Sequence, residues 1–251
     1  MSKFSGLLIC SDFDGTLFCN GKVSEENLEA IRYFQENGGL FTLATGRYPT
    51  ILEAVKVSFK CNAPMLCMNG AIIYDSQNDK TLWEGKMLRD YTDILMEILR
   101  TQSGLRDLRI CASDEWKAEY FDFDDRDGIS SAMARDPYKI LVHVDSEFSE
   151  ELRDRAIALS GDGYSICRSW QNGVEIQESY YDKGKSSRRL ADMLGADKLI
   201  CVGDYENDIP MLREADLSVA VGNAIDSVKE IADIVTARAD EHGIARLIES
   251  L

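Results

Sequence analysis

Short apolar runs alternate with helical patterns over most of this chain of 251 residues. The first run is Leu7–Ser11, and Ser24, which follows it, is a residue type that commonly caps the start of a helix. A second run, Leu40–Ala44, comes next, and the same order returns near the C-terminus with runs at Leu199–Val202 and Leu217–Val221. Strands that alternate with helices are typical of a parallel sheet covered on both faces. The sequence therefore predicts an α/β fold.

The middle of the chain, between about Leu82 and Asp182, follows a different order. Its strand patterns neighbour one another instead of alternating regularly with helices, as in an α+β domain with an antiparallel sheet. The helical patterns lie at 89–101 and 149–159, and the strand patterns at 108–112, 116–121, 138–144, 164–168 and 174–177. We expect residues 1–81 and 183–251 to form one discontinuous domain and residues 82–182 to be inserted into it.

Three local features refine this outline. Pro49 suits the first turn of a further helix. Two short strand patterns, Met65–Met68 and Ala71–Tyr74, flank a turn at Asn69–Gly70. The acidic run Asp122–Asp127 predicts a solvated loop or hairpin tip.

Charge and hydropathy limit the possible partners. The chain has 28 Lys and Arg against 44 Asp and Glu, a net charge of −16 that repels nucleic acid and anionic membranes. We expect neither as a partner, and an anionic substrate would need a local cation.

The apolar runs are too short to span a bilayer, and Asp12 and Asp14 interrupt the first before it resembles a secretory signal. This predicts a cytoplasmic protein, and seven cysteines without a CxxC pair and only two histidines argue against structural zinc.

The sequence DFDGT, residues 12–16, comes directly after the first predicted strand. Side chains two residues apart in an extended chain point the same way, which places the carboxylates of Asp12 and Asp14 on one side. In an open parallel sheet, ligands bind at this end of the strands. Two carboxylates so close together imply a shared proton or a nearby cation.

A second acidic sequence, GDYENDIPML at residues 203–212, follows a later predicted strand. Asp204 ends that strand, and four-residue helical spacing brings Asp208 toward the same side. With Asp12 and Asp14, these residues make a cluster of hard oxygen ligands on one rim of the sheet. Mg²⁺ is the natural cation for such a cluster.

Two further segments offer groups that bind anions. Thr45, Gly46 and Arg47 follow the second strand and supply a hydroxyl and backbone N–H groups at its end. Lys183 and Lys185, in DKGKSS, begin a helix just after the insert. A cation there could hold a phosphoryl group among the carboxylates.

Taken in order, DFDGT, TGR, the lysine and GDYEND make the chain resemble the haloacid dehalogenase-like hydrolase superfamily, and its Cof-type phosphatases in particular. The sequences MNGA at 68–71, GNA at 222–224 and HGIARLI at 242–248 support this resemblance, which covers the whole chain. It implies a doubly wound, Rossmann-like parallel sheet as the catalytic core domain. It also implies that the insert is an α+β cap domain between the second and third motifs.

The resemblance also implies catalytic roles. Asp12 would be the nucleophile and Asp14 the general acid and base. Thr45 would hydrogen-bond the phosphoryl oxygens, and Lys183 would neutralise them together with the nucleophile. Lys185 is the second choice for this lysine, because in the family the lysine precedes a glycine and only Lys183 does so.

Metal and phosphate contacts follow from the same resemblance. Asp204 would bind Mg²⁺ together with the Asp12 carboxylate and the Asp14 backbone carbonyl. Asp208 would lie in that shell or just behind it. Asn207 would contact the phosphate or orient a ligand, beside Thr45–Arg47 and Lys183.

These roles predict a Mg²⁺-dependent phosphatase that hydrolyses small phosphorylated metabolites, such as sugar phosphates, through an aspartyl-phosphate. A phosphomutase would share that intermediate, and a non-enzymatic phospho-aspartate switch would share the acidic pocket. Dehalogenation is disfavoured, because it needs neither a metal nor the proton that Asp14 would supply.

Overall fold

A computed structural model describes residues 2–51, 60–114 and 116–251 of the chain. Its contacts divide the chain into two compact units. We call Met1–Glu84 with Asp182–Leu251 the core unit, and Gly85–Tyr181 the inserted unit. The helix predicted from Pro49 falls largely on residues 52–59, outside the described ranges.

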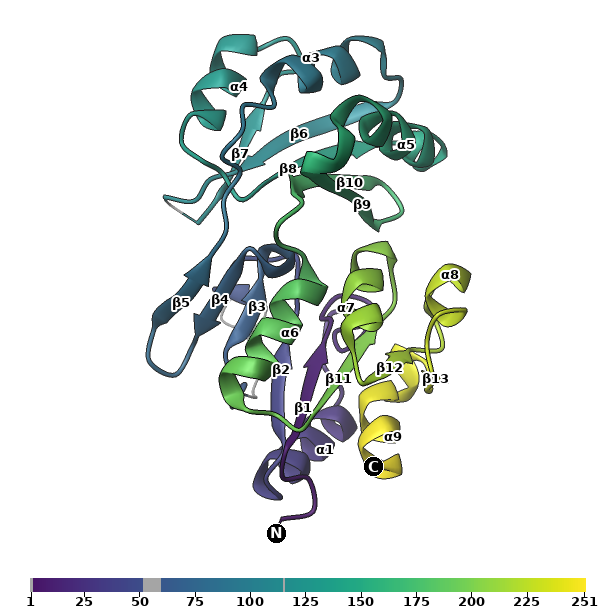
Figure 1. Cartoon of the computed structure of the whole chain (residues 1–251). Helices are drawn as coiled ribbons and strands as arrows, with labels where there is room; N and C mark the ends of the chain where they lie inside the picture. Colours follow the sequence, from purple (N-terminus) through teal and green to yellow (C-terminus); the bar gives the residue numbers. More distant parts are fainter. Residues whose placement is uncertain (1, 52–59, 115) are drawn as a thin grey trace. The chain divides into compact units, whose positions relative to one another are not determined.

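The core unit is built on a five-stranded sheet in which all neighbouring strands are parallel, in the order β13-β12-β11-β1-β2 (Figure 1). The strands are β1 (Leu7–Ser11), β2 (Leu40–Leu43), β11 (Lys198–Gly203), β12 (Leu217–Ala220) and β13 (Ile234–Val235). The central strands β1 and β11 are almost entirely buried, as expected for a parallel sheet between two layers of helices. This sheet confirms the predicted α/β fold class.

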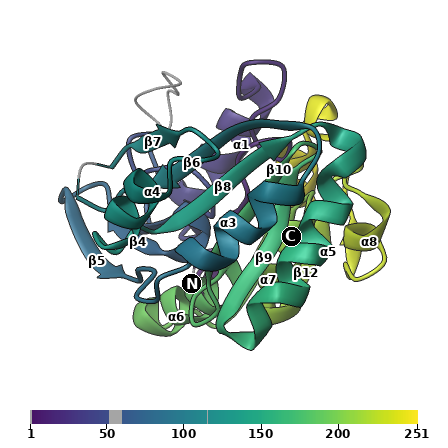
Figure 2. The same ribbon diagram turned by 90° about the horizontal axis from the view of Figure 1, so that it is seen from above.

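Helices cover both faces of this sheet. One pair, α1 and α9, packs together, and so does a second pair, α6 and α7; Figures 1 and 2 show the pairs on opposite faces. The helices are α1 (Glu25–Glu36), α6 (Lys183–Leu194), α7 (Ile209–Glu214), α8 (Asp226–Lys229) and α9 (Gly243–Ser250), with short 3₁₀ turns η4 (Glu206–Asp208) and η5 (Ala239–Glu241). Ser24 caps α1, because its side chain accepts a hydrogen bond from the backbone N–H of Asn27.

A small antiparallel sheet, β3-β4-β5, also belongs to the core unit. It consists of β3 (Met65–Cys67), β4 (Ile72–Asp75) and β5 (Lys80–Glu84), with a 3₁₀ turn η1 (Met68–Gly70) between the first two. Strand β5 is absent from the sequence-based outline, which begins the insert at residue 82. Its side chains are alternately exposed and half-buried, so no apolar run marks it.

The inserted unit contains a five-stranded antiparallel sheet, in the order β7-β6-β8-β10-β9. Its elements are α3 (Thr92–Thr101), β6 (Leu105–Cys111), β7 (Ala118–Phe121), α4 (Arg126–Met133), β8 (Lys139–Val144), η2 (Ser146–Phe148), α5 (Ser149–Ser160), η3 (Gly161–Gly163), β9 (Tyr164–Trp170) and β10 (Gly173–Glu178). Helices α3, α4 and α5 form one apolar core with the sheet face that carries Val142 and Val144. His143 alternates with these two valines and bonds Asp107 instead.

The acidic run 122–127 is more than the solvated loop predicted from its charge. The Asp125 side chain accepts a hydrogen bond from the N–H of Gly128 and caps α4, so Arg126 and Asp127 are already helical. Acidic residues favour a helix N-terminus because they accept from free N–H groups and oppose the helix dipole. In the described ranges, every helix is too short or too polar to cross a bilayer.

Candidate active site

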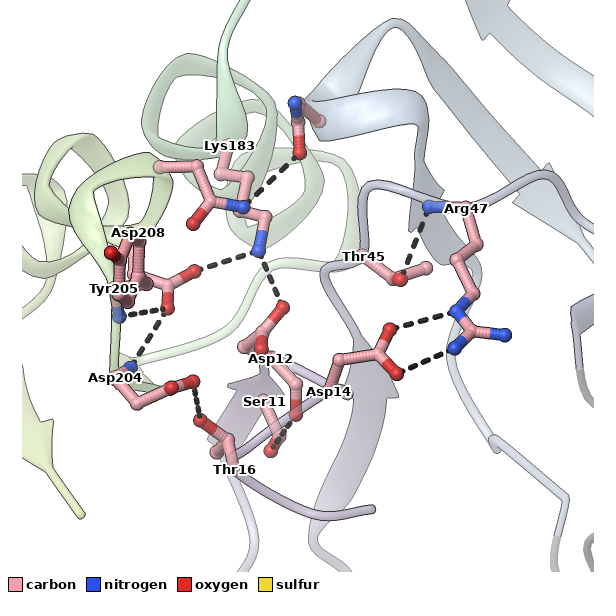
Figure 3. A network of polar contacts seen from close by, with 12 residues as sticks. Ser11, Asp12, Asp14, Thr16, Thr45, Arg47, Lys183, Asp204, Tyr205 and Asp208 are labelled. Atoms are coloured by element: carbon pink, nitrogen blue, oxygen red, sulfur yellow. Dashed lines mark hydrogen bonds and ion pairs between the residues drawn. The ribbon is translucent and has the colours of Figure 1, made fainter. Parts of the chain in front are cut away.

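A buried lysine at the start of α6 lies between Asp12, which follows β1, and Asp208, the last residue of η4. The Lys183 ammonium is 2.5 Å from Oδ1 of Asp12 and 2.7 Å from Oδ1 of Asp208 (Figure 3). The Lys183 side chain is fully buried. It begins α6, whose N-terminus is fixed by Asp182, which accepts from the backbone N–H of Lys185. Segments that are far apart in the chain therefore meet at one charged centre.

A third carboxylate completes the centre. Asp12, Asp204 and Asp208 each offer an oxygen within 4.8 Å of the others. Asp12 and Asp204 directly follow the parallel neighbours β1 and β11, so the sheet register brings them together. The hydroxyl of Thr16 donates to Asp204 over 2.7 Å, and this places the DFDGT loop against the second acidic motif.

The two carboxylate oxygens of Asp208 have different partners. Its Oδ1 atom binds Lys183, whereas its Oδ2 atom accepts from the backbone N–H groups of Asp204 and Tyr205, at 2.8 and 3.1 Å. Both oxygens are thereby engaged within the protein. Asp208 therefore links the Lys183 ammonium to the turn on which Asp204 lies.

Crowding of negative charge shifts the acidity of this centre. Burial, and next the Asp208 carboxylate, raise the pKa of Asp12 well above its usual range. Burial and Asp208 also raise the pKa of Asp204 to about 7. Although burial opposes its charged form, Asp12 and Asp208 raise the pKa of Lys183, so the lysine is a permanent cation. One lysine does not neutralise three carboxylates, and the centre has a deficit of positive charge.

The loop between Asp14 and Thr16 requires glycine at its centre. Gly15 has φ +82°, and a Cβ atom there would lie 2.6 Å from a carboxylate oxygen of Asp204. The Gly15 carbonyl accepts from the side chain of Asn223 over 2.8 Å. Asn223 lies in the GNA sequence, whose residues alone did not indicate a role. Its contact gives that sequence a local function, since it anchors the DFDGT loop.

Asp14 lies apart from the three-carboxylate cluster in the described chain. Its carboxylate is paired side-on with Arg47, with Nε–Oδ2 and Nη2–Oδ1 distances of 2.7 and 2.6 Å (Figure 3). Strand β1 ends at Ser11, and the backbone N–H groups of Leu17 and Phe18 both bond to the carbonyl of Phe13. The chain is curled here, so the alternation of an extended strand does not determine where Asp14 points.

The Thr45–Arg47 loop is fixed by the turn η1. The N–H of Met68 donates to the carbonyl of Arg47, and the N–H of Asn69 to that of Thr45, both over 3.0 Å. Met68 and Asn69 have φ of 51° and 53°, left-handed values that non-glycine residues seldom adopt. Backbone strain of this kind persists where surrounding contacts impose it. The turn is a supporting element of the site, and its Asn-Gly pair was a signal for it in the sequence.

The remaining predicted residues lie around this centre. Asn207 is buried and its side chain donates to Asn69 over 3.4 Å. Gly46 lies between Thr45 and Arg47, after β2. The ammonium of Lys185 is half-exposed and lies 3.0 Å from Asp182. Of the two candidate lysines, the geometry therefore brings Lys183 to the aspartates and leaves Lys185 at the helix surface.

A parallel α/β sheet carries a buried lysine and three aspartates at its carboxyl edge, and comparison with known proteins shows the class of protein to which this arrangement belongs. A sequence profile of haloacid dehalogenase-like hydrolases matches residues 9–248. The chain therefore belongs to the haloacid dehalogenase-like hydrolase family, as its Cof-type motifs predict. It is an enzyme, a phosphoric monoester hydrolase of this family.

Individual relatives align over nearly the whole chain. The 5-amino-6-(5-phospho-D-ribitylamino)uracil phosphatase YcsE of Bacillus subtilis is 28% identical over 257 residues, covering 96% of this chain and 94% of the relative. Two solved structures are similar in fold, each with 20% identity. The subclass IIB sugar phosphatase BT4131 has a TM-score of 0.78 and 97% and 98% coverage. BT1666 of Bacteroides thetaiotaomicron has a TM-score of 0.76 and 100% and 97% coverage.

Proposed function

We propose that this chain is a Mg²⁺-dependent phosphatase that transfers the phosphoryl group of a small metabolite to Asp12 and then to water. The observation that carries the proposal is the contact of the buried Lys183 ammonium with Asp12 inside a cluster of three carboxylates. A carboxylate held by a cation in a pocket that also favours a further cation is suited to approach an anionic phosphoryl group.

The donor set fits Mg²⁺. All three residues offer carboxylate oxygens, the ligand type that this ion prefers. The pKa values of Asp12 and Asp204 are raised because these carboxylates are buried close together without a divalent ion to stabilise their charged forms. Asp12 and Asp204 would hold the ion with the backbone carbonyl of Asp14, and Asp208 would support them. When bound, Mg²⁺ would offset charge on the phosphoryl oxygens.

In this mechanism Asp12 accepts the phosphoryl group, and Asp14 transfers the protons. An oxygen of Asp12 forms a bond to phosphorus as the bond to the leaving oxygen breaks, and Asp14 gives its proton to that oxygen. In the second half, water attacks phosphorus, its proton passes to Asp14, and the bond between Asp12 and phosphorus breaks. Lys183 and Thr45 stabilise the phosphoryl oxygens in both halves. Inorganic phosphate and the free alcohol are the products.

The substrate we propose is a phosphorylated small molecule such as a sugar or sugar-alcohol phosphate. YcsE is named for a phosphorylated ribitylamino compound, and phosphate on a polyhydroxylated chain is the chemistry shared with sugar phosphates. Residues 82–182, predicted as a cap domain, would supply the contacts to the leaving group. Such caps select substrates and exclude water when they close.

The test is phosphate release from a panel of sugar, polyol and nucleoside monophosphates, each measured with Mg²⁺ and with a chelator. We expect release that depends on Mg²⁺ and is strongest for sugar or polyol phosphates. Asp12→Asn keeps the shape of the side chain but removes the nucleophile, and should reduce turnover by roughly a thousandfold or more. Substantial turnover by Asp12→Asn, or full activity in chelator, would refute the proposal.

A further inference from the structure

The Asp14 carboxylate is paired with Arg47, whereas Asp12 and Asp208 are paired with Lys183. Lys183 binds Asp12 and Asp208 and is fully buried. The Asp14 carboxylate instead meets both Nε and Nη2 of Arg47, at 2.7 and 2.6 Å. A guanidinium that binds a carboxylate through two parallel hydrogen bonds fixes the plane of the carboxylate as well as its position. Arg47 therefore determines the orientation of Asp14, which an ammonium group would leave undetermined.

Both ends of this pair are fastened to the site. The carbonyl of Arg47 accepts from Met68, and its own N–H donates to the hydroxyl of Thr45 over 3.2 Å. Its guanidinium carbon lies 5.9 Å from the ring centroid of Phe13, a buried residue next to Asp14. The loops after β1 and β2, which are neighbouring parallel strands, are thus joined through one pair of side chains.

The pair is open to solvent, and this argues against a role in folding. The side chains of Arg47 and Asp14 are 44% and 47% exposed. Exposed ion pairs contribute little to stability, because water solvates both partners and salt screens them. A bidentate geometry at such a place controls orientation far more than it stabilises the fold.

We propose that Arg47 is the positioning residue of Asp14: it holds the ionised carboxylate beside the site, and one of the two hydrogen bonds gives way when Asp14 takes up the proton that it then passes to the leaving oxygen. This inference rests on the proposed function, in which Asp14 is the general acid. It goes beyond phosphate binding by Arg47, the role that the TGR sequence suggests. If Arg47 only bound phosphate, every phosphate ester would depend on it equally. If it positions Asp14, esters with poor leaving groups would depend on it more.

The experiment compares kcat/KM for glycerol 3-phosphate and p-nitrophenyl phosphate, both with Mg²⁺. This parameter reports the steps up to departure of the leaving group, and only the alkoxide of glycerol needs a proton. We expect Arg47→Ala to lower the ratio of the two values, glycerol phosphate over nitrophenyl phosphate, at least tenfold. Arg47→Lys, which keeps the charge but not the two parallel bonds, should give an intermediate ratio. An equal loss for both substrates would overturn the inference.

A double-mutant cycle separates this inference from the proposed function. Asp14→Asn should lower the same ratio, and adding Arg47→Ala to it should change the ratio no further, because the group to be positioned is absent. If Asp14→Asn leaves the ratio unchanged, the acid role of Asp14 fails. If both single variants lower the ratio and their effects multiply, Arg47 does not act through Asp14.

The matched control is Arg246→Ala. Arg246 is another solvent-exposed arginine of the core unit, on α9, and is paired with Glu249 over 2.8 Å. We expect it to leave both kcat/KM values unchanged. Thermal unfolding of each variant shows whether it folds, and Arg47→Lys keeps the comparison available if Arg47→Ala does not. A lowered ratio in Arg246→Ala would mean that loss of any surface arginine has this effect, and would overturn the inference.

Discussion

Each unit of the molecule buries a lysine against carboxylates, and the two arrangements differ in their balance of charge. In the inserted unit, Lys139 on β8 lies 2.5 Å from Glu175 on β10, and the two side chains are 3% and 4% exposed. In the core unit, Lys183 faces Asp12 and Asp208, with Asp204 beside them. Counted over the described residues that these ion pairs and the carboxylate cluster name, the first set has one positive and one negative charge, whereas the second has one positive and three negative charges.

This difference separates a structural ion pair from a candidate site. Removing charges from water is costly, so buried charges normally occur in balanced pairs. An excess of buried negative charge is tolerated where a cation or a proton makes up the balance. The shifted pKa values of Asp12 and Asp204 express this imbalance. The core unit therefore bears an arrangement that folding alone would not favour.

The largest effects are expected when each lysine is replaced, and they test whether the two charge arrangements differ. Lys139→Met removes the ammonium that contacts the buried Glu175 carboxylate, and should lower the free energy of unfolding by about 3–5 kcal/mol. Lys183→Met should destabilise the core unit comparably without metal, and saturating Mg²⁺ should restore part of the loss. Urea unfolding with Mg²⁺ and with chelator measures both effects.

A matched control removes both partners in the inserted unit. Replacing Lys139 and Glu175 together by Met and Leu should cost much less than Lys139→Met alone, because both charges of the pair are removed at once. The response to Mg²⁺ decides the comparison. If Mg²⁺ stabilises Lys139→Met as much as Lys183→Met, the charge excess around Lys183 is not a cation site.

A smaller effect, opposite in sign, is expected from Asp204→Asn. Removal of one carboxylate relieves repulsion, so the metal-free variant at pH 8 should gain about 1–2 kcal/mol in free energy of unfolding. Turnover should fall roughly a hundredfold, because a metal ligand is lost. Thermal unfolding and phosphate release measure the two changes.

Asp216→Asn is the control for that prediction. Asp216 accepts from the N–H of Leu199 and pairs with Arg188, and these contacts lower its pKa. Its removal should destabilise the protein modestly and leave turnover unchanged. A loss of stability in Asp204→Asn like that in Asp216→Asn would mean that Asp204 is held by structural contacts and is not strained by charge.

The sequence predicts the buried, apolar elements of the molecule better than the half-exposed or highly charged ones. Buried strands such as β1 and β11 are readable because their apolar runs are continuous, and the motif order identifies the family. Strand β5 is hidden, because a half-exposed edge strand has no continuous apolar run. Helix α4 is hidden in an acidic run that charge alone describes as solvated.

In the site, the sequence indicates which residues lie close together when the register of the strands determines this. It does not indicate the direction of a side chain that depends on a distant partner. The register of β1 with β11 brings Asp12 to Asp204. The direction of Asp14 depends on the curled loop after Ser11 and on Arg47, more than thirty residues away in the chain. No local pattern encodes such a long-range pairing. Asn69 was visible only as a turn residue, because its contact with Asn207 comes from tertiary packing.

The smallest expected effect is the pH dependence of metal binding, and it sharpens the comparison most directly. In the metal-free protein the pKa of Asp204 is raised to about 7, above its value in the unfolded chain. Its proton therefore stabilises the folded state at low pH, and that contribution is lost as the pH rises through 7. Mg²⁺ must displace this proton. Its apparent affinity should be roughly tenfold lower at pH 6 than at pH 8, a difference of about 1.4 kcal/mol.

Calorimetric titration of Mg²⁺ at pH 6, 7 and 8 measures this dependence, with proton release obtained from buffers of different ionisation enthalpy. Near pH 7, about half a proton per ion should be released from Asp204. In Asp204→Asn the part of the release that comes from Asp204 should disappear along with most of the affinity. Unchanged affinity between pH 6 and pH 8 would show that Asp204 is already ionised without the metal. The carboxylates around Lys183 would then be solvated well enough to coexist, and the contrast with the balanced pair of Lys139 and Glu175 would lose its meaning.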